Sequence, residues 1–246
     1  MARDLTKVFG RGDIVALENV SFEVTHGDFV SVVGPSGCGK STLLRLTAGL
    51  IDRSSGSLTV RGEEVKAPRP DIAMMFQRPI LLPWKTAIDN VMLPRRLEGR
   101  TGREDLKAAR DLLHLLALDG FEHTYPRHLS GGMQQRVALA RLLITGAELL
   151  LLDEPFASLD EFTRERLNLE LLRIQAEVDA TAMFVTHNIT EAVFLADHVL
   201  VMTPRPGRLA GIVDVPFERP RAIELLKTPE FNELAFQVRS ILGESI

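Results

Sequence analysis

The sequence predicts an α/β fold, in which a mostly parallel sheet is interrupted once by a block of helices. Short apolar runs that are typical of buried strands recur along the chain and alternate with segments of helical periodicity. From about residue 78 to residue 145 the pattern is helical throughout. Strands that alternate with helices are typical of a parallel sheet, so the helical block is expected to be an insertion into it.

The strands and helices are expected in a fixed order. An alternating pattern over 14–24 predicts the first strand, and a turn follows at His26-Gly27-Asp28. Further strands are predicted at 29–33, 57–61, 72–76, 148–153, 182–186 and 199–202. Helices are predicted at 41–50, 87–97, 104–118, 130–144, 164–178, 189–196 and 230–242.

The composition is that of a soluble globular protein: of 246 residues, 45% are hydrophobic and 25% are charged. The net charge is −4, so the chain lacks the excess of basic residues that is typical of nucleic-acid binding, and no nucleic-acid partner is expected. The single cysteine excludes an internal disulfide and indicates a reducing compartment. No signal-peptide pattern is present, and no apolar run approaches the about 20 residues that span a bilayer. Any membrane role is therefore expected to go through a partner.

A glycine-rich stretch matches the phosphate-binding pattern G-x-x-x-x-G-K-[ST] and lies between a predicted strand and a predicted helix, as the P-loop requires. Its glycines let the backbone turn and aim N–H groups at phosphate oxygens, and the helix N-terminus adds the positive end of its dipole. Lys40 is expected to reach the β- and γ-phosphates, Ser41 to ligate Mg²⁺, and Cys38 to be a small filler. The strand and helix favour nucleotide binding over a chance match. The candidate binding residues are Gly34, Pro35, Ser36, Gly37, Cys38, Gly39, Lys40, Ser41 and Thr42.

An acidic pair, Asp153-Glu154, ends the predicted strand of four leucines. Open α/β sheets bind ligands at the carboxyl ends of their strands. Asp153 is therefore expected to hold Mg²⁺ through water, and Glu154 to polarise an attacking water. The alternative is a strand that simply ends at a charged turn.

A second segment, Leu-Ser-Gly-Gly-Met-Gln-Gln-Arg at 129–136, opens a predicted helix. Ser130 is a good N-cap, and Gly131 and Gly132 allow close backbone approach to an anion. From these residues alone, a second phosphate site and an ordinary capped helix both remain open.

Together, the P-loop, this segment and the Leu-Leu-Leu-Leu-Asp-Glu-Pro strand resemble the ATP-binding cassette (ABC) ATPases over about residues 5–210. The resemblance implies one domain that hydrolyses ATP with Mg²⁺. It also implies a P-loop NTPase (RecA-like) core formed by residues 1–77 and 146–246, with an antiparallel β subdomain at its edge. Residues 78–145 are then an inserted helical subdomain. Family members usually have an N-terminal strand with a few more residues before the position of Asp4, so this N-terminal strand is expected to be incomplete.

The resemblance also assigns roles to single residues. Phe9 is similar to the aromatic residue that stacks on adenine, and Gln77 to the glutamine that touches Mg²⁺ and the attacking water. His187 is similar to the switch histidine that contacts the γ-phosphate; its alternative is a solvated histidine at a strand end. The other histidines are expected to be ordinary solvated side chains without a role in the site: His26, His114, His123, His128 and His198.

The resemblance further implies a head-to-tail dimer of two copies. Each ATP is then held between the P-loop of one copy and the segment at 130–134 of the other. The residues expected to touch the partner's ATP are Ser130, Gly131, Gly132 and Gln134. Ser158-Leu159-Asp160 is similar to the loop that crosses the dimer interface, with Asp160 as the interface residue.

Two segments are similar to importers of the nitrate, sulfonate and taurine group: 77–91, and Pro-Arg-Pro-Gly-Arg at 204–208. This implies membrane permease partners, an indirect link to an external solute-binding protein, and a place on the cytoplasmic face of the membrane. Trp84 is expected to face the permease; its alternative is a core aromatic. A lipid or metabolite exporter is the alternative function. A soluble ABC ATPase acting on DNA or ribosomes is disfavoured, because the chain has one cassette and no CxxC pair or heptad run.

Overall fold

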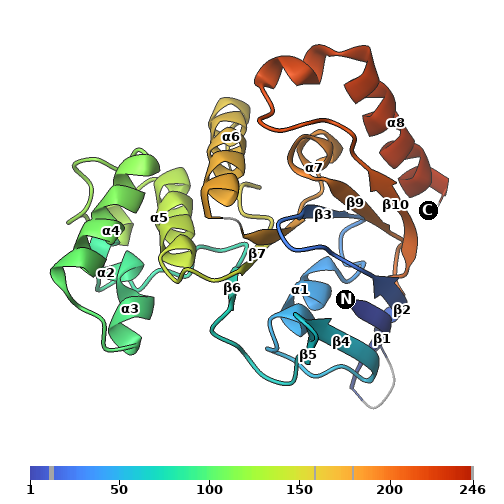
Figure 1. Cartoon of the computed structure of the whole chain (residues 1–246), viewed down its shortest axis with the longest axis horizontal. Helices are drawn as coiled ribbons and strands as arrows, with labels where there is room; N and C mark the ends of the chain where they lie inside the picture. Colours follow the sequence, from blue (N-terminus) through green and yellow to red (C-terminus); the bar gives the residue numbers. More distant parts are fainter. Residues whose placement is uncertain (11–13, 158, 179, 245–246) are drawn as a thin grey trace.

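The computed structural model describes residues 1–10, 14–157, 159–178 and 180–244. Its main sheet has the strand order β10-β9-β3-β8-β7-β6 (Figure 1). The strands are β3 (Phe29–Val33), β6 (Ile72–Met75), β7 (Leu149–Asp153), β8 (Thr181–Val185), β9 (His198–Met202) and β10 (Leu209–Asp214). All neighbours are parallel except β10, which runs antiparallel to β9. This confirms the predicted α/β class with a mostly parallel sheet.

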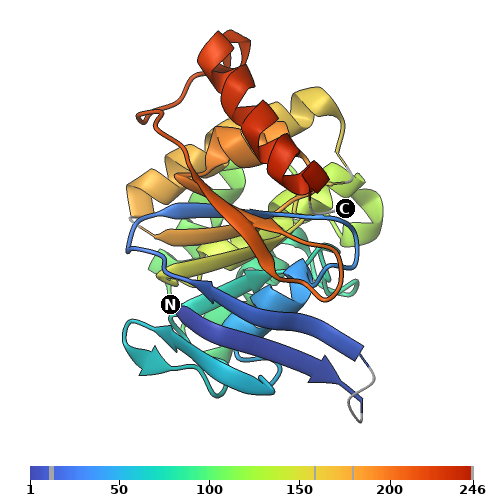
Figure 2. The same cartoon turned by 90° about the vertical axis from the view of Figure 1, so that its right-hand side faces the viewer.

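A second, antiparallel sheet has the order β2-β1-β4-β5 and lies below the main sheet in Figure 2. It is built from β1 (Ala2–Phe9), β2 (Ile14–Phe22), β4 (Ser55–Val60) and β5 (Glu63–Glu64). Strand β1 is eight residues long and pairs with both β2 and β4.

Helix α1 (Lys40–Thr47) lies between the two sheets. The four leucines of β7 alternate between the two faces of the main sheet: Leu149 and Leu151 pack in the cluster that contains α1 and the antiparallel sheet. Leu150 and Leu152 pack in the cluster on the opposite face, with residues of the other helices. A strand covered on both faces needs an unbroken apolar run, which is why this strand could be predicted.

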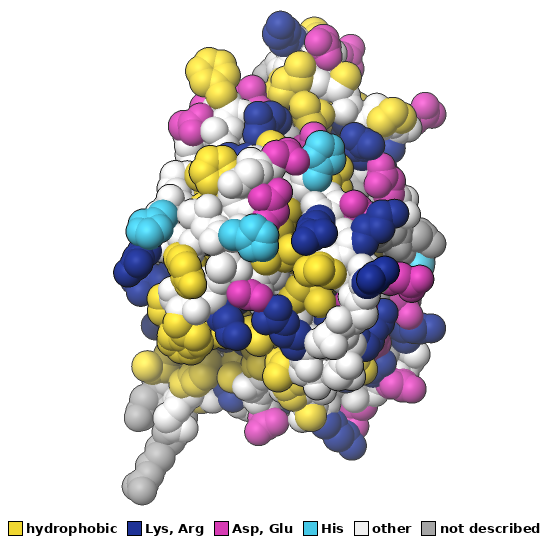
Figure 3. Space-filling model, turned by 90° about the vertical axis from the view of Figure 1, so that its left-hand side faces the viewer, with side chains coloured by type: hydrophobic (Ala, Val, Ile, Leu, Met, Phe, Trp, Pro, Cys, Tyr) yellow, Lys and Arg dark blue, Asp and Glu magenta, His cyan; other side chains and the backbone are white. Residues whose placement is uncertain are grey.

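The helical block forms the end of the molecule seen on the left of Figure 1. It contains α2 (Ala87–Val91), α3 (Leu93–Leu97), α4 (Arg103–Leu115), the 3₁₀ helix η1 (Pro126–His128) and α5 (Gly131–Leu143). The single helix predicted over 87–97 is wrong, because it divides at Met92. Pro94 lacks the N–H that would bond to the Asn90 carbonyl, and it lies in the first turn of the second helix. Figure 3 shows this end, on which hydrophobic side chains lie among acidic and basic ones.

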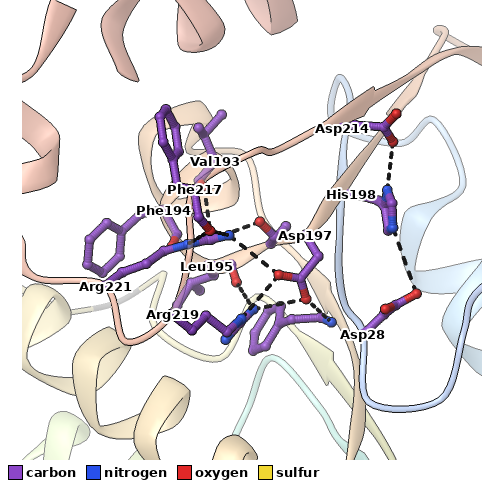
Figure 4. A network of polar contacts seen from close by, with 12 residues as sticks. Asp28, Val193, Phe194, Leu195, Asp197, His198, Asp214, Phe217, Arg219 and Arg221 are labelled. Carbon is purple, nitrogen blue, oxygen red and sulfur yellow. Dashed lines mark hydrogen bonds and ion pairs between the residues drawn. The ribbon is translucent and has the colours of Figure 1, made fainter. Parts of the chain in front are cut away.

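The remaining helices are α6 (Glu161–Val178), α7 (Ile189–Leu195), η2 (Ile223–Lys227) and α8 (Pro229–Glu244). The segment before η2 is bonded to the end of α7 (Figure 4). The side chain of Arg221 is fully buried and donates to the carbonyls of Phe194 and Ala196, at 2.8 Å each. Arg219 pairs with Asp197, whose carboxylate also accepts the first N–H of β3. None of the helices in the described part of the chain is both long and apolar enough to cross a membrane.

Candidate nucleotide-binding site

A cavity of about 510 Å³ opens where parallel strands of the main sheet end. The segments that follow the carboxyl ends of β9, β3, β8, β7 and β6 all reach this edge, because those strands are parallel neighbours. Of the predicted residues, the lining contains Phe9, Ser36, Gly37, Gly39, Lys40, Ser41, Thr42, Gln77, Glu154 and His187. It also contains Arg205, for which the sequence suggested no role.

The phosphate loop between β3 and α1 needs its glycines. Gly37 and Gly39 have positive φ angles of 76° and 107°, which L side chains rarely adopt. A Cβ atom at Gly39 would lie 2.6 Å from Leu17 Cδ2. Lys40 is 6% exposed, and its Nζ donates to the carbonyls of Gly34 at 2.7 Å and Pro35 at 3.0 Å. The loop therefore curls around the ammonium group and holds it at the cavity wall.

Cys38 is buried inside the same loop, as its filler role requires. Burial raises the pKa of its thiol, so the group stays neutral at physiological pH. A Cβ atom at Gly34 would lie 2.8 Å from the Cys38 sulfur, so the close packing of this thiol also depends on a glycine. Gly34, Pro35 and Cys38 thus build the loop without lining the cavity.

Ser41 and Asp153 form the part of the site that fits a magnesium ion. The Ser41 hydroxyl donates to Asp153 Oδ1 at 2.8 Å, and Asp153 lies behind it with 4% exposure. Burial raises the pKa of the Asp153 carboxyl. The described residues contain no group of three or more His, Cys, Asp and Glu side chains suited to a metal. A hydroxyl with a carboxylate behind it fits Mg²⁺, which binds one or two protein oxygens and completes its shell with phosphates and waters.

Glu154 lies at the centre of the predicted catalytic group. Its Oε2 atom is 3.5 Å from Gln77 Nε2 and 3.2 Å from His187 Nδ1. The backbone of Glu154 is left-handed, with φ of 45°, a conformation that costs a non-glycine residue on the order of 1–3 kcal/mol. Its N–H still bonds to the Val185 carbonyl at 2.9 Å. Two residues, from the ends of β6 and β8, therefore meet the carboxylate at the end of β7.

The start of α5 does not line this cavity. Ser130 caps the helix, and its hydroxyl accepts the N–H of Met133 at 3.3 Å. A Cβ atom at Gly132 would lie 3.1 Å from Leu159, whereas one at Gly131 would meet nothing within 4 Å. The side-chain amide of Gln134 donates to the loop before its own helix. These residues therefore lie apart from the cavity of their own chain.

The predicted interface loop leads into α6. Asp160 is exposed, and its Oδ1 accepts the N–H of Thr163 at 3.0 Å. This hydrogen bond lowers the pKa of the Asp160 carboxyl. Ser158 lies outside the described residues. Asp160 is therefore a helix cap, and its exposure leaves it free to reach a partner as well.

Two residues that the sequence analysis missed tie α5 to the Gln77 segment. Gln135 is 3% exposed and donates to the Gln77 carbonyl at 2.8 Å. Arg141 donates to the carbonyls of Pro79 at 2.7 Å and Ile80 at 2.9 Å. The sequence does show polar residues within this apolar helix, which indicates that they have polar partners. It does not show which partners, because these lie about 60 residues earlier in the chain. These hydrogen bonds join α5 directly to the backbone of the Gln77 segment.

Trp84 is 69% exposed, so the alternative of a core aromatic is wrong. Its loop is held by Asn90, a fully buried residue that was not predicted. Asn90 Oδ1 accepts the N–H of Leu82 at 2.7 Å. Its amide donates to the carbonyls of Leu82, Lys85 and Thr86, at 3.2, 3.1 and 2.9 Å. One side chain thus fixes the loop that presents Trp84 to its surroundings.

The chain is similar to known proteins. The family profile described as ABC transporter matches residues 17–157. A taurine import ATP-binding protein of Rhizobium johnstonii is 44% identical, over 95% of this chain and 91% of its own length. A nitrate import ATP-binding protein of Synechococcus elongatus is 42% identical, over 94% of this chain and 86% of its own. A solved dimer of an ATP-binding cassette in a post-hydrolysis state, bound to ADP and phosphate, superposes with a TM-score of 0.79. It is 31% identical and covers 88% of this chain and 99% of its own.

Proposed function

Because this chain belongs to the ABC transporter family and is an ATPase of that family, we propose that it is the ATP-hydrolysing subunit of an import system. Import ATP-binding proteins are similar to it over nearly its whole length. The solute is proposed to be a small anion or organic solute of the kind for which those relatives are named. It would meet a membrane permease and an external solute-binding protein, whereas this subunit would lie on the cytoplasmic face of the membrane.

The phosphate loop would hold MgATP by its N–H groups and by Lys40, whose ammonium would exchange the carbonyls of Gly34 and Pro35 for phosphate oxygens. Ser41, Gln77 and, through water, Asp153 would hold the metal. When bound, Mg²⁺ neutralises charge on the β- and γ-phosphates. Phe9 lines the same cavity and would stack on the adenine.

The convergence on Glu154 is the observation that carries the proposal of hydrolysis. Its carboxylate would accept the proton of a water that Gln77 orients, while His187 would contact the γ-phosphate. The backbone of Glu154 is anchored by the bond from its N–H to the Val185 carbonyl, which helps to position the carboxylate.

Hydrolysis would be coupled to transport through a head-to-tail dimer. The Ser130 helix start lies outside its own cavity and would cover the ATP of the second copy. Asp160 would contact that copy across the interface. Because Gln135 and Arg141 tie α5 to the Gln77 segment, closure of the dimer would move the neighbouring loop that presents Trp84 to the permease.

Glu154→Gln tests the proposal. The amide keeps the size and hydrogen-bonding reach of the carboxylate but cannot act as a base. Turnover should fall by a factor on the order of 10²–10⁴, while MgATP binding survives. Glu148→Gln is the matched control, because it makes the same chemical change at the other end of β7, just before the strand begins. Wild-type turnover in Glu154→Gln, or equal losses in both variants, would contradict the catalytic assignment.

A further inference from the structure

The loop between β9 and β10, residues 203–208, lies against the phosphate loop. Gly207 donates its N–H to the Ala16 carbonyl at 3.1 Å and accepts the N–H of Glu18 at 3.0 Å. A Cβ atom at Gly207 would lie 1.9 Å from the Cys38 carbonyl oxygen, so only glycine fits between β2 and the phosphate loop. The loop is therefore docked at a fixed place beside the cavity.

The same loop is braced from within. The Thr203 hydroxyl accepts the N–H of Arg208 at 3.0 Å and lies 3.0 and 3.1 Å from the carbonyls of Pro204 and Pro206. Arg208 pairs with Glu18 of β2 at 2.7 Å. These contacts fix the backbone on both sides of the residue between the two prolines.

That residue is Arg205, which lines the cavity. Its guanidinium donates to the Gly37 carbonyl, in the middle of the phosphate loop, at 3.3 Å. In the part of the chain that the structure describes, no ion pair joins Arg205 to a carboxylate, in contrast to Arg208. A guanidinium has five N–H donors, and one contact to a carbonyl leaves most of them for a ligand. The cation is thus placed beside an anion site without a protein anion of its own.

We propose that Arg205 is a nucleotide ligand, whose guanidinium binds the phosphate chain of ATP or ADP and adds a second cation to Lys40. The topology supports this role. Strands β9 and β3 are parallel neighbours, so the loop with Arg205 after β9 and the phosphate loop after β3 leave the sheet at the same edge. The contact to Gly37 places the guanidinium on the phosphate part of the cavity. This inference rests on the proposed nucleotide site and extends it to a loop more than 160 residues further along the chain.

The test compares Arg205→Ala and Arg205→Lys with Arg239→Ala, a control that removes an exposed cation of α8 that does not line the cavity. MgATP and MgADP are titrated into each purified protein. Arg205→Ala should raise Kd for both nucleotides by about five- to twentyfold, because an exposed charge-assisted hydrogen bond is lost. Arg205→Lys should recover part of the affinity, and Arg239→Ala should stay within about twofold of wild type. The difference between wild type and Arg205→Ala should shrink as salt is added.

Competition by inorganic tripolyphosphate identifies the part of the nucleotide that is touched. Arg205→Ala should lose affinity for tripolyphosphate as it does for MgATP. An unchanged tripolyphosphate affinity would place the guanidinium on the base or ribose and overturn the inference. Equal MgATP affinity in wild type and Arg205→Ala would overturn it as well, while leaving the proposed function intact. A wild-type protein that binds MgATP no better than Lys40→Ala would instead overturn the nucleotide site itself.

Discussion

At Asp153, burial of the carboxylate lowers the stability of the folded protein, whereas the proposed binding of Mg²⁺ needs that carboxylate. Burial raises the pKa of its carboxyl, so the folded protein binds this proton more tightly than the unfolded chain does. The contribution to the free energy of unfolding is therefore fully present below the unfolded pKa and is lost as the pH rises through the folded pKa. Above the unfolded pKa, burial of this carboxyl therefore destabilises the nucleotide-free protein.

Asp153→Asn should accordingly raise the Tm of the nucleotide-free protein at pH 7 while it lowers Mg²⁺-dependent ATP hydrolysis. The gain should vanish as the pH falls to about 3.9, where the unfolded aspartate also becomes neutral. Thermal unfolding of both proteins across this range checks the sign. Asp111→Asn, an exposed aspartate on α4, is the control and should leave Tm unchanged. A lower Tm for Asp153→Asn at pH 7 would show that the bond from Ser41 to the charged carboxylate outweighs burial.

The residues that sequence could indicate are those whose type and spacing carry the chemistry. Lys40, Ser41 and Asp153 belong to patterns that can be read locally, and the structure brings them together. Arg205 and Asn90 could not be assigned in this way, because their importance comes from contacts made after distant segments meet. A charged residue just past a buried strand was the one signal for Arg205.

Among the secondary-structure elements, those buried on both faces were predictable and those with irregular pairing were not. Every residue of β3 and β7 is buried, so an apolar run indicates a strand without any choice of face. Bulges interrupt β1: its buried residues Ala2 and Leu5 are three apart, and Asp4 between them has φ of 49°. In β10 only one residue is buried. The bulges remove the alternation of burial in β1. Burial does alternate in β10, but the sequence does not show it, because the hydrophobic residue Ile212 is exposed. Sequence periodicity could therefore not find either strand.

The loop before α2 is the element proposed to meet the permease. Since Asn90 holds the loop backbone, Trp84→Ala should remove the exposed ring without disturbing the fold or the ATPase activity of the isolated subunit. Truncation of an aromatic anchor should weaken assembly with the permease by about 2 kcal/mol, or roughly thirtyfold. Pull-down of the co-expressed permease measures this. Phe236→Ala is the control, because Phe236 is 68% exposed on α8. Equal capture by Trp84→Ala and wild type would show that this tryptophan is not an anchor.

At the scale of the whole molecule, the two segments proposed to bind ATP do not line the same cavity. The phosphate loop, Glu154 and His187 share one cavity, whereas Ser130 and Gly131 lie outside it on α5. A similar cassette was solved as a dimer bound to ADP and phosphate. A head-to-tail dimer would complete each site with residues of the other copy, and the nucleotide would belong to the interface.

This arrangement predicts that dimer formation depends on the γ-phosphate and on Ser130. Glu154→Gln should bind MgATP, fail to hydrolyse it, and accumulate as a dimer. Loss of the negative charge near the γ-phosphate should stabilise that dimer further. With MgADP the same variant should stay monomeric. Adding Ser130→Arg should leave MgATP binding nearly intact, because Ser130 lies outside its own chain's cavity, but should abolish the dimer, because the bulky cation blocks the partner's γ-phosphate.

Size-exclusion chromatography of the single and double variants, each with MgATP and with MgADP, separates these outcomes. Exposed Ser130 caps α5 through one hydrogen bond, so the double variant should keep its fold at a cost of about 1 kcal/mol for the lost cap. Far-UV circular dichroism and nucleotide titration of the double variant control for this loss. If the double variant binds MgATP and still dimerises like Glu154→Gln, the nucleotide does not lie between the phosphate loop of one copy and the start of α5 in the other. If Glu154→Gln itself stays monomeric with MgATP, closure of the dimer does not follow from ATP binding, and the coupling through α5 to the permease loses its physical basis.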